Sequence, residues 1–341
     1  MIHKNITHIL IVRLTALGDI VNTAIVLQLI KRFYTDKNEE VKIDWLCEEV
    51  FAPLIQNHHD INQVHTINLK KLKKERSFSL LKHEVKKLKN LVNYTQIIDM
   101  QGLLKSAIVS RMIGKNIHGY DKASTREGIA SIFYKTTSTI NYHDSIVYRN
   151  AKLASEAIGY TLQENDIRLK TKVLPSQTKP TFLDTTPTYA VFIIGASWPS
   201  KCYPKEKFAQ LALELGVPIV LVWGSEQEKN DASWIKETCN NHDNHQIIIP
   251  QKLSLPQLSA TIEYSLITIG NDTGPTHMAW GLNRPSITLF GPTNERMIYP
   301  TPINRFINSS SEVNISKINK NDFSIEDISV DSIVTLVQEI L

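Results

Sequence analysis

The chain has 341 residues, 42% of them hydrophobic and 21% charged, which is the composition of a soluble globular protein. Its length is long for one hydrophobic core and predicts two domains, while a net charge of +4 is too small to indicate a nucleic-acid partner. Three scattered cysteines exclude a disulfide framework and lack metal-ligand spacing, and no apolar run approaches the ~18–20 residues of a membrane span, so we expect a cytoplasmic protein.

Apolar strands alternate with amphipathic helices in the first half of the chain. Residues 9–14 predict a strand that breaks at 15–19, and a helix follows over 20–33. This repeated alternation predicts a doubly wound, mostly parallel sheet. The other elements expected in this half are strands at 41–47, 64–67 and 94–100, a short helix at 50–56, and a helix from Gly102 to Ile113.

A strongly basic segment lies between the third and fourth expected strands. Residues 70–89 hold nine lysines and arginines against two glutamates, a net charge of +7, and carry leucine and valine at helical spacing. A solvated helix face is one interpretation of this pattern. A surface that faces anionic lipid or an acidic substrate is the other, and it predicts peripheral contact with an anionic inner-membrane surface.

The second half repeats the α/β alternation after a proline- and threonine-rich stretch. We therefore expect an N-terminal Rossmann-like domain over 1–170, a linker over 171–187 and a second Rossmann-like domain over 188–324. A C-terminal helix over 325–341 is expected to pack back toward the N-terminal domain. The expected elements of the second domain are strands at 189–194, 218–223, 266–269 and 286–290, and helices at 205–215 and 226–239.

The junction at residues 266–280 is the most informative stretch. Its apolar strand stops at Gly270, and Pro275 suits the first turn of a helix that runs through Trp280. Asp272 and Thr273 then lie at a helix start, whose free N–H groups favour an anion, and Gly274 allows close approach to the backbone. An ordinary N-cap is the alternative, since Asp and Thr are favoured caps.

Several polar residues follow predicted strands, whereas the common nucleotide motifs are absent. Neither a Gly-x-Gly-x-x-Gly nor a Walker A sequence occurs, which argues against NAD, and no Asp-x-Asp pair offers a simple metal site. Because the carboxyl ends of parallel strands meet at one edge, Asp19, the 196–201 loop, Glu226 and Asp272 are expected to converge on a crevice. Two α/β domains with a ligand between them fit a glycosyltransferase, but also many other enzymes.

Several motifs together resemble the ADP-heptose lipopolysaccharide heptosyltransferases, glycosyltransferase family 9, over nearly the whole chain. They are Leu-Gly-Asp at 17–19, Asp-Met-Gln-Gly-Leu-Leu-Lys-Ser-Ala at 99–107, Trp-Gly-Ser-Glu at 223–226, Asn-Asp-Thr-Gly-Pro-Thr-His at 271–277, Asn-Arg-Pro at 283–285 and Phe-Gly-Pro-Thr at 290–293. The 99–107 stretch favours the heptosyltransferase I branch. The resemblance implies a GT-B fold, with two doubly wound domains facing a central cleft, and an inverting transfer that needs no cofactor and no metal.

The resemblance also assigns roles to residues of the expected donor side. Lys201 matches a lysine near the donor diphosphate, and Glu226 matches a glutamate that accepts hydrogen bonds from the adenosine ribose. The loop that holds diphosphate and heptose corresponds to Asp272, Thr273 and Gly274, with His277 one helical turn further on. Where the family has Thr-Thr-Arg before the lysine, this chain has Ala196-Ser197-Trp198, of which Ser197 keeps a hydroxyl for the donor.

On the acceptor side the resemblance assigns one acid and three basic residues. Asp19 matches the proposed general base, which inversion by a single displacement requires. An N-cap is the alternative role for this aspartate. Lys105, Arg126 and Arg149 match basic positions that face Kdo and phosphate groups.

The resemblance implies transfer of L-glycero-D-manno-heptose from ADP-heptose to Kdo of Kdo-lipid A, by a monomer peripheral on the cytoplasmic face of the inner membrane. Two alternatives remain open. The chain could be a heptosyltransferase for another acceptor, namely the second core heptose or a protein hydroxyl. It could also be a non-catalytic ADP-sugar-binding protein.

Overall fold

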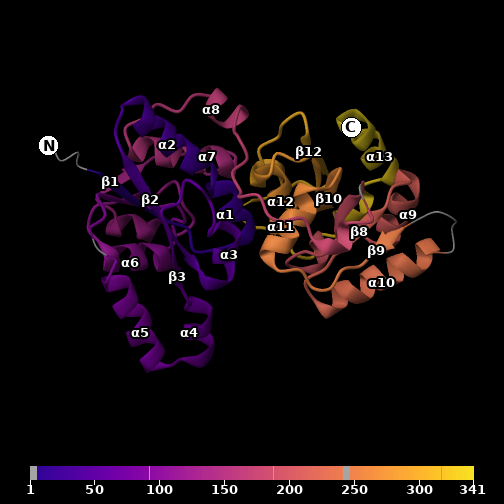
Figure 1. Cartoon of the computed structure of the whole chain (residues 1–341), viewed down its shortest axis with the longest axis horizontal. Coiled ribbons are helices and arrows are strands. Elements are labelled where there is room, and N and C mark those ends of the chain that lie inside the picture. The colour runs from indigo at the N-terminus through magenta and orange to yellow at the C-terminus, as the bar shows by residue number, and fades with distance from the viewer. Residues whose placement is uncertain (1–5, 92, 187, 241–245, 316) are drawn as a thin grey trace. The chain divides into compact units, whose positions relative to one another are not determined.

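The computed structural model describes residues 6–91, 93–186, 188–240, 246–315 and 317–341. It consists of two compact units, Met1–Pro175 (unit 1) and Ser176–Leu341 (unit 2), each folded around its own sheet (Figure 1). The division falls inside the stretch expected as a linker. The domain limits that the sequence predicts, at 170/171 and 187/188, stay predictions.

Unit 1 contains a six-stranded sheet in the order β3-β2-β1-β4-β5-β6, with every pair parallel. The strands are β1 (Thr7–Val12), β2 (Val41–Glu48), β3 (Gln63–Ile67), β4 (Gln96–Asp99), β5 (Ile117–Tyr120) and β6 (Thr136–Ser138). The helices are α1 (Leu17–Thr23), α2 (Ile25–Asp36), α3 (Ala52–Ile55), α4 (Leu69–Glu75), α5 (Phe78–Lys89), α6 (Leu104–Ile113), α7 (Ile146–Ala157) and α8 (Asn165–Arg168). The register aligns Val12 with Leu46 and Asp99, so Asp19 and Gln101 follow strands that end at the same sheet edge.

Helices cover the sheet of unit 1 because their apolar residues recur at helical spacing. Leu88 of α5 and Val109 of α6 pack on Leu10, Val12 and other strand residues of one core. The helix expected over 20–33 is two helices, α1 and α2, which meet at Ala24.

Unit 2 has a second six-stranded parallel sheet, in the order β12-β11-β10-β7-β8-β9. Its strands are β7 (Ala190–Ile193), β8 (Ile219–Val222), β9 (Ile247–Ile248), β10 (Ile267–Asn271), β11 (Ser286–Phe290) and β12 (Asn304–Asn308). Its helices are α9 (Lys205–Leu215), α10 (Glu226–Asn240), α11 (Leu255–Glu263), α12 (Gly274–Gly281) and α13 (Val330–Ile340). The expected α/β class with two parallel sheets is thus confirmed.

The C-terminal helix buries its apolar face within unit 2. Ile333, Leu336 and Val337 of α13 belong to the core that also contains Phe208 and Leu211 of α9. The expectation of a helix near the C-terminus therefore holds, and its apolar stripe is used inside unit 2. Its expected packing toward the N-terminal domain stays a prediction.

No helix in the described part of the chain combines the length and the apolar character that crossing a bilayer requires.

Candidate active site

A cavity of about 370 Å³ opens at the carboxyl ends of β7, β8 and β10 in unit 2. The cavity is lined by loop residues that follow these strands and by aliphatic side chains at the start of α11. The lining residues are Ile193, Gly195, Ala196, Ser197, Val222, Trp223, Gly224, Glu228, Lys252, Leu253, Leu255, Leu258, Thr273 and Pro275. Parallel α/β sheets bind their ligands at this edge, so the cavity is the candidate ligand site of unit 2.

The start of α12 forms one wall of this cavity. Thr273 is the N-cap and Pro275 lies in the first turn, as the sequence predicts. The Thr273 side chain makes no capping hydrogen bond within the described residues, so it leaves the N–H groups of the first turn to other partners. The positive end of an eight-residue helix therefore lies beside the cavity, where it favours an anion.

The Asp272 side chain links the three segments of unit 2 that contain Lys201, Thr293 and His277. The side chain is 3% exposed, and it receives hydrogen bonds from Lys201 Nζ at 2.6 Å and Thr293 Oγ1 at 2.8 Å. His277 Nε2 lies 3.1 Å from its other oxygen. Burial by itself would raise the pKa of Asp272, but the His277 hydrogen bond and the Lys201 charge outweigh it and hold the pKa well below its usual range. Asp272 is therefore a carboxylate at neutral pH.

Asn271 holds the loop after β7 against β10. Its side-chain amide donates to Ile194 O at 2.8 Å, and its oxygen accepts from Tyr203 N at 2.9 Å. Between these two anchors the loop carries Ser197, which is exposed at the cavity rim, and Lys201, whose Nζ lies 5.0 Å from the centre of the Trp198 ring. Trp198 therefore supports the lysine through a cation–π contact.

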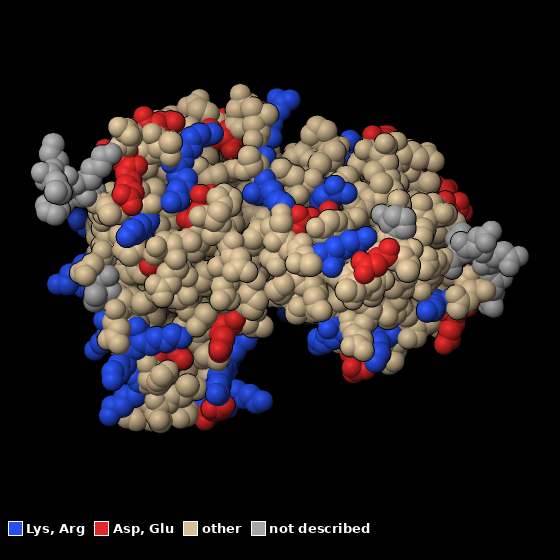
Figure 2. Space-filling view, viewed as in Figure 1, with Lys and Arg blue, Asp and Glu red and all other residues tan. Residues whose placement is uncertain are grey.

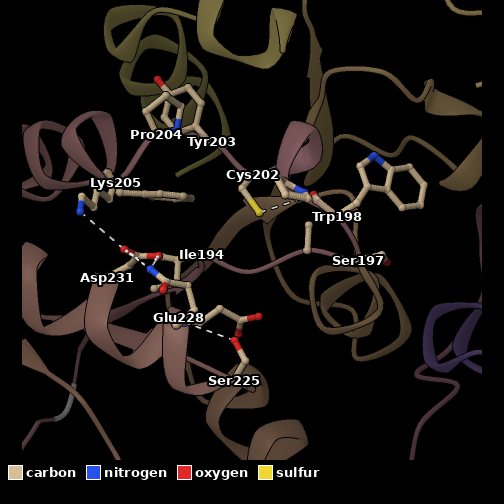
Figure 3. A pocket seen from close by; sticks show the side chains of 14 residues that line it. Ile194, Ser197, Trp198, Cys202, Tyr203, Pro204, Lys205, Ser225, Glu228 and Asp231 are labelled. Atoms are coloured by element: carbon tan, nitrogen blue, oxygen red, sulfur yellow. Dashed lines mark hydrogen bonds and ion pairs between the residues drawn. The ribbon is translucent and has the colours of Figure 1, made fainter. Parts of the chain in front are cut away.

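A second cavity of about 420 Å³ adjoins the first and shares Ala196, Ser197 and Glu228 with it (Figure 3). Glu228 lies at the junction, and its Oε2 accepts a hydrogen bond from Gly224 N at 2.6 Å. A Cβ atom at Gly195 would lie 2.2 Å from the Glu228 carboxyl carbon. Glycine at 195 is thus needed for this carboxylate to approach the β7 loop.

Glu226, the expected partner of the donor ribose, lies at the surface of unit 2. Glu226 is exposed in the first turn of α10 and is not among the described residues that line either cavity, whereas Glu228 lines both. Two residues along a helix are about 200° apart, so the two side chains lie on different faces of α10. Glu228 was not a candidate from the sequence, because the Trp-Gly-Ser-Glu match ends at Glu226. The contact of Glu226 with a donor ribose stays a prediction.

A third, polar cavity of about 210 Å³ lies at the ends of β11 and β12. Its lining residues are Gly291, Thr293, Asn294, Glu295, Asn308, Ser309, Ser311 and Val313. Because Thr293 also bonds Asp272, this cavity is next to the Asp272 cluster.

In unit 1, Asp19 lies in the first turn of α1. One carboxylate oxygen is 2.7 Å from an Arg13 guanidinium nitrogen, and the other accepts from Ala16 N at 3.0 Å. The side chain is 26% exposed, so it remains open to solvent. The N-cap of α1 is Ala16, so the N-cap role considered for Asp19 is wrong; Asp19 is the third helical residue, and its carboxylate accepts from the N-cap N–H.

The basic residues expected on the acceptor side occupy different environments. Lys105 is exposed and donates to Thr15 Oγ1 at 3.2 Å, in the loop that leads to Asp19. Arg126 is exposed in the segment before the turn of 3₁₀ helix at Gly128–Phe133. Arg149 is 3% exposed, donates to Ser124 O, and stacks 4.9 Å from the ring centres of Tyr120 and Tyr142.

Arg149 therefore acts in the structure as a link between α7 and the loops that contain Ser124 and Tyr142. Its contact with an acceptor, like that of Lys105 and Arg126, stays a prediction.

Two parallel α/β units, one with a candidate ligand cavity at a helix N-terminus, make up the GT-B fold. The Escherichia coli structures described as heptosyltransferase WaaC with ADP and with ADP-2-deoxy-2-fluoro heptose superpose with TM-scores of 0.80 and 0.78, each at 24% identity. They cover 98% of this chain and 100% and 99% of their own.

Sequence comparisons identify the family. Residues 83–326 match the model of glycosyltransferase family 9 (heptosyltransferase). Lipopolysaccharide heptosyltransferase 1 of Campylobacter coli is 35% identical over 347 residues, which cover 97% of this chain and 98% of that protein. The chain belongs to glycosyltransferase family 9, and the resemblance that its motifs carry is confirmed.

Proposed function

We propose that the protein transfers L-glycero-D-manno-heptose from ADP-heptose to Kdo of Kdo-lipid A, with inversion and without a metal. The observation that carries the proposal is the Lys201–Asp272–His277 cluster beside the α12 N-terminus and the cavity of unit 2. The family supports a heptosyl transfer, and the name of the Campylobacter relative supports a lipopolysaccharide acceptor. The titles of the Escherichia coli structures support an ADP-linked heptose donor.

On the donor side, the diphosphate binds at Thr273 and Gly274, where the first turn of α12 offers backbone N–H groups and a positive dipole end. Lys201 adds a cation, and Asp272 holds its ammonium group in place while leaving other N–H donors for phosphate oxygens. These groups stabilise the charge that grows on ADP as it leaves, a task that a metal ion performs in other enzymes.

The nucleoside occupies the cavity of about 370 Å³. Leucines 253, 255 and 258 offer an apolar wall for the adenine ring, and Glu228 offers carboxylate oxygens to the ribose hydroxyls. Ser197 at the rim adds a hydroxyl. The heptose lies on the Thr293 side of Asp272, near the polar cavity of about 210 Å³.

On the acceptor side, Asp19 of unit 1 takes the proton of the attacking Kdo hydroxyl. The acceptor oxygen forms a bond to the anomeric carbon of heptose while the bond from that carbon to the ADP oxygen breaks on the opposite face, which inverts the configuration. Arg13 and the Ala16 N–H orient the carboxylate, and Lys105 supplies a cation for the acidic acceptor.

The protein then works as a monomer that is peripheral on the cytoplasmic face of the inner membrane. The family also includes enzymes with other acceptors, so a heptosyltransferase for the second core heptose or for a protein is the nearest alternative. A non-catalytic ADP-sugar-binding protein is the other, and the exposed carboxylate of Asp19 speaks against it.

The experiment that tests the proposal measures ADP release from ADP-heptose with Kdo-lipid A in the presence of EDTA. We expect a rate that survives EDTA and falls about 10²-fold or more in Asp19→Ala. Asp19→Asn is the matched variant, because it keeps an oxygen for the Ala16 N–H and removes the base. Both variants should bind ADP like the wild type.

Wild-type protein that binds donor but is silent with Kdo-lipid A and active with heptosylated or protein acceptors would reassign the acceptor. Absence of product with every acceptor at saturating donor would overturn the enzyme proposal. Full activity of Asp19→Asn would require a different base.

A further inference from the structure

Helices α4 and α5 form a hairpin that extends from unit 1 (Figure 1). Arg76 ends α4 in the left-handed conformation with φ 49°, and Ser77 caps α5 by accepting a hydrogen bond from Leu80 N. Leu88 near the end of α5 is 2% exposed in the core, which anchors the hairpin at its base. The turn at 75–78 therefore lies between two helices with defined ends, of which α5 is anchored in the core.

The hairpin surface is strongly cationic. Its basic side chains are exposed at Lys70, Lys71, Lys73, Lys74, Arg76, Lys82, Lys86 and Lys89, and Figure 2 shows lysine and arginine gathered over this part of unit 1. Of the two acids in the segment, Glu84 is 6% exposed and Glu75 lies at the surface. The charge presented to solvent is thus almost entirely positive, which complements an anionic surface.

The outer end of the hairpin is also apolar. Phe78, the first residue of α5, is 75% exposed, and Leu81 is 46% exposed. A purely solvated cationic face gains nothing from a phenylalanine held at its tip. Large apolar side chains surrounded by lysines are the pattern of segments that lie in the interface of a lipid bilayer.

We propose that the α4–α5 hairpin docks the protein on an anionic lipid bilayer. Phe78 and Leu81 insert among the lipid headgroups, and the surrounding lysines and Arg76 bind anionic headgroups. The reason for docking rests on the proposed function, since the proposed acceptor is a lipid. The binding to a bilayer is inferred from the hairpin alone. An aliphatic leucine beside the phenylalanine favours a bilayer over a nucleic acid, which would use the aromatic ring for stacking.

The test uses the full chain and sedimentation with vesicles of phosphatidylcholine alone or with about 30% phosphatidylglycerol. We expect binding to the anionic vesicles that weakens strongly as salt rises from 0.05 to about 0.5 M. Phe78→Ser with Leu81→Ser should reduce partitioning about tenfold. Lys73→Glu with Lys74→Glu should reduce it about 100-fold at low salt.

Matched controls change the same chemistry elsewhere on unit 1. Ile132→Ser alters a side chain that is 72% exposed outside the hairpin, and Lys115→Glu with Lys135→Glu reverses two exposed lysines. Both should bind anionic vesicles much as the wild type does. Equal losses in the controls, equal binding to neutral vesicles, or hairpin variants that bind normally would each overturn the proposal. Single-stranded RNA could also displace the protein from vesicles when its negative charge equals that of the anionic lipid. That result would overturn the proposal too, because it would identify the hairpin as a nucleic-acid surface.

Docking and catalysis can be separated because vesicle binding needs neither donor nor transfer. The hairpin variants should keep full activity on a Kdo acceptor without acyl chains, which also shows that they fold. Absence of wild-type activity with Kdo-lipid A would remove the proposed function and leave the docking result intact. Normal vesicle binding by the hairpin variants would remove the docking proposal and leave the function intact.

Discussion

At the scale of single residues, Asp272 determines whether the donor side of unit 2 holds together. Asp272→Asn removes the charged partner of Lys201, a residue that is 7% exposed. We expect the free energy of unfolding of unit 2 to fall by about 3–5 kcal/mol, because breaking a buried ion pair strands the remaining charge. Urea unfolding measures this loss.

Two further variants test the cause of that loss. Adding Lys201→Met to Asp272→Asn should restore most of the stability, because the stranded charge is removed. Thr293→Val, which deletes one hydrogen bond to the carboxylate, should cost about 1 kcal/mol. A double variant no more stable than Asp272→Asn would show that Lys201 is not what Asp272 compensates.

Glu228 and Glu226 give a second prediction at this scale. Glu228→Ala should weaken ADP binding about tenfold or more, since it removes a charged acceptor from the cavity, whereas Glu226→Ala should stay within about twofold. Gly195→Ala should reproduce the Glu228 effect, because its Cβ would displace that carboxylate. Calorimetric titration with ADP measures all three. The opposite order of the two alanine variants would support the ribose contact predicted for Glu226 and contradict that of Glu228.

At the scale of elements, the sequence predicts the strands and helices whose buried faces are uniformly apolar. Helix α9 and strand β11 have the residue bounds that periodicity indicates. Strand β5 and helix α7 were missed because polar residues interrupt their pattern. His118 of β5 is buried between Thr136 and Ser138, and Asn150 of α7 is buried against Thr23. A partner distant in the sequence makes each of these polar residues acceptable in a core.

The site shows the same division between local and distant information. The helix start at Thr273 and Gly274 can be predicted locally, because Pro275 and the strand before it are signals in one stretch. The contact of Lys201 with Asp272 joins residues 71 positions apart, and family resemblance rather than spacing pointed to it. Which glutamate of α10 lines the cavity depends on how the helix is rotated about its axis. The Trp-Gly-Ser-Glu motif carries no information on that rotation.

The turn after α3 provides a prediction of pH dependence. Burial lowers the pKa of His58 to about 4, although the Asp60 carboxylate raises it. In the unfolded chain His58 takes up a proton near pH 6.5, whereas in the folded protein it does so only near pH 4. The unfolded form therefore binds more protons between these two pH values. The contribution of neutral His58 to the free energy of unfolding is therefore complete above pH 6.5 and is lost as the pH falls toward 4. The loss is about 3 kcal/mol at most.

His58→Gln should remove that part of the dependence. The difference between wild type and variant in the free energy of unfolding of unit 1 is measured at pH 7.5 and at pH 4.5, so that shared titration of carboxylates cancels. A difference independent of pH would mean that the His58 ring is protonated in the folded protein.

At the scale of the whole molecule, the candidate residues divide between the two units. The cavity lining, Lys201 and the Asp272 cluster belong to unit 2, whereas Asp19, Lys105 and Arg126 belong to unit 1. Each unit has its own parallel sheet and apolar core. Donor binding should therefore be a property of unit 2, and transfer should require both units.

A fragment of residues 176–341 tests this division. It keeps α13, whose Ile333 and Leu336 complete the core of unit 2, and it contains every described residue of the 370 Å³ cavity. We expect it to bind ADP within about threefold of the full chain, because no nucleotide contact is lost. A fragment of residues 1–175 should bind no ADP, and neither fragment should transfer heptose. Asp19→Asn in the full chain is the control, since it should match the 176–341 fragment by binding ADP without transfer. If the folded 176–341 fragment binds ADP more than about 100-fold more weakly than the full chain, residues of unit 1 contribute directly to nucleotide binding, and the assignment of the donor site to unit 2 alone is wrong.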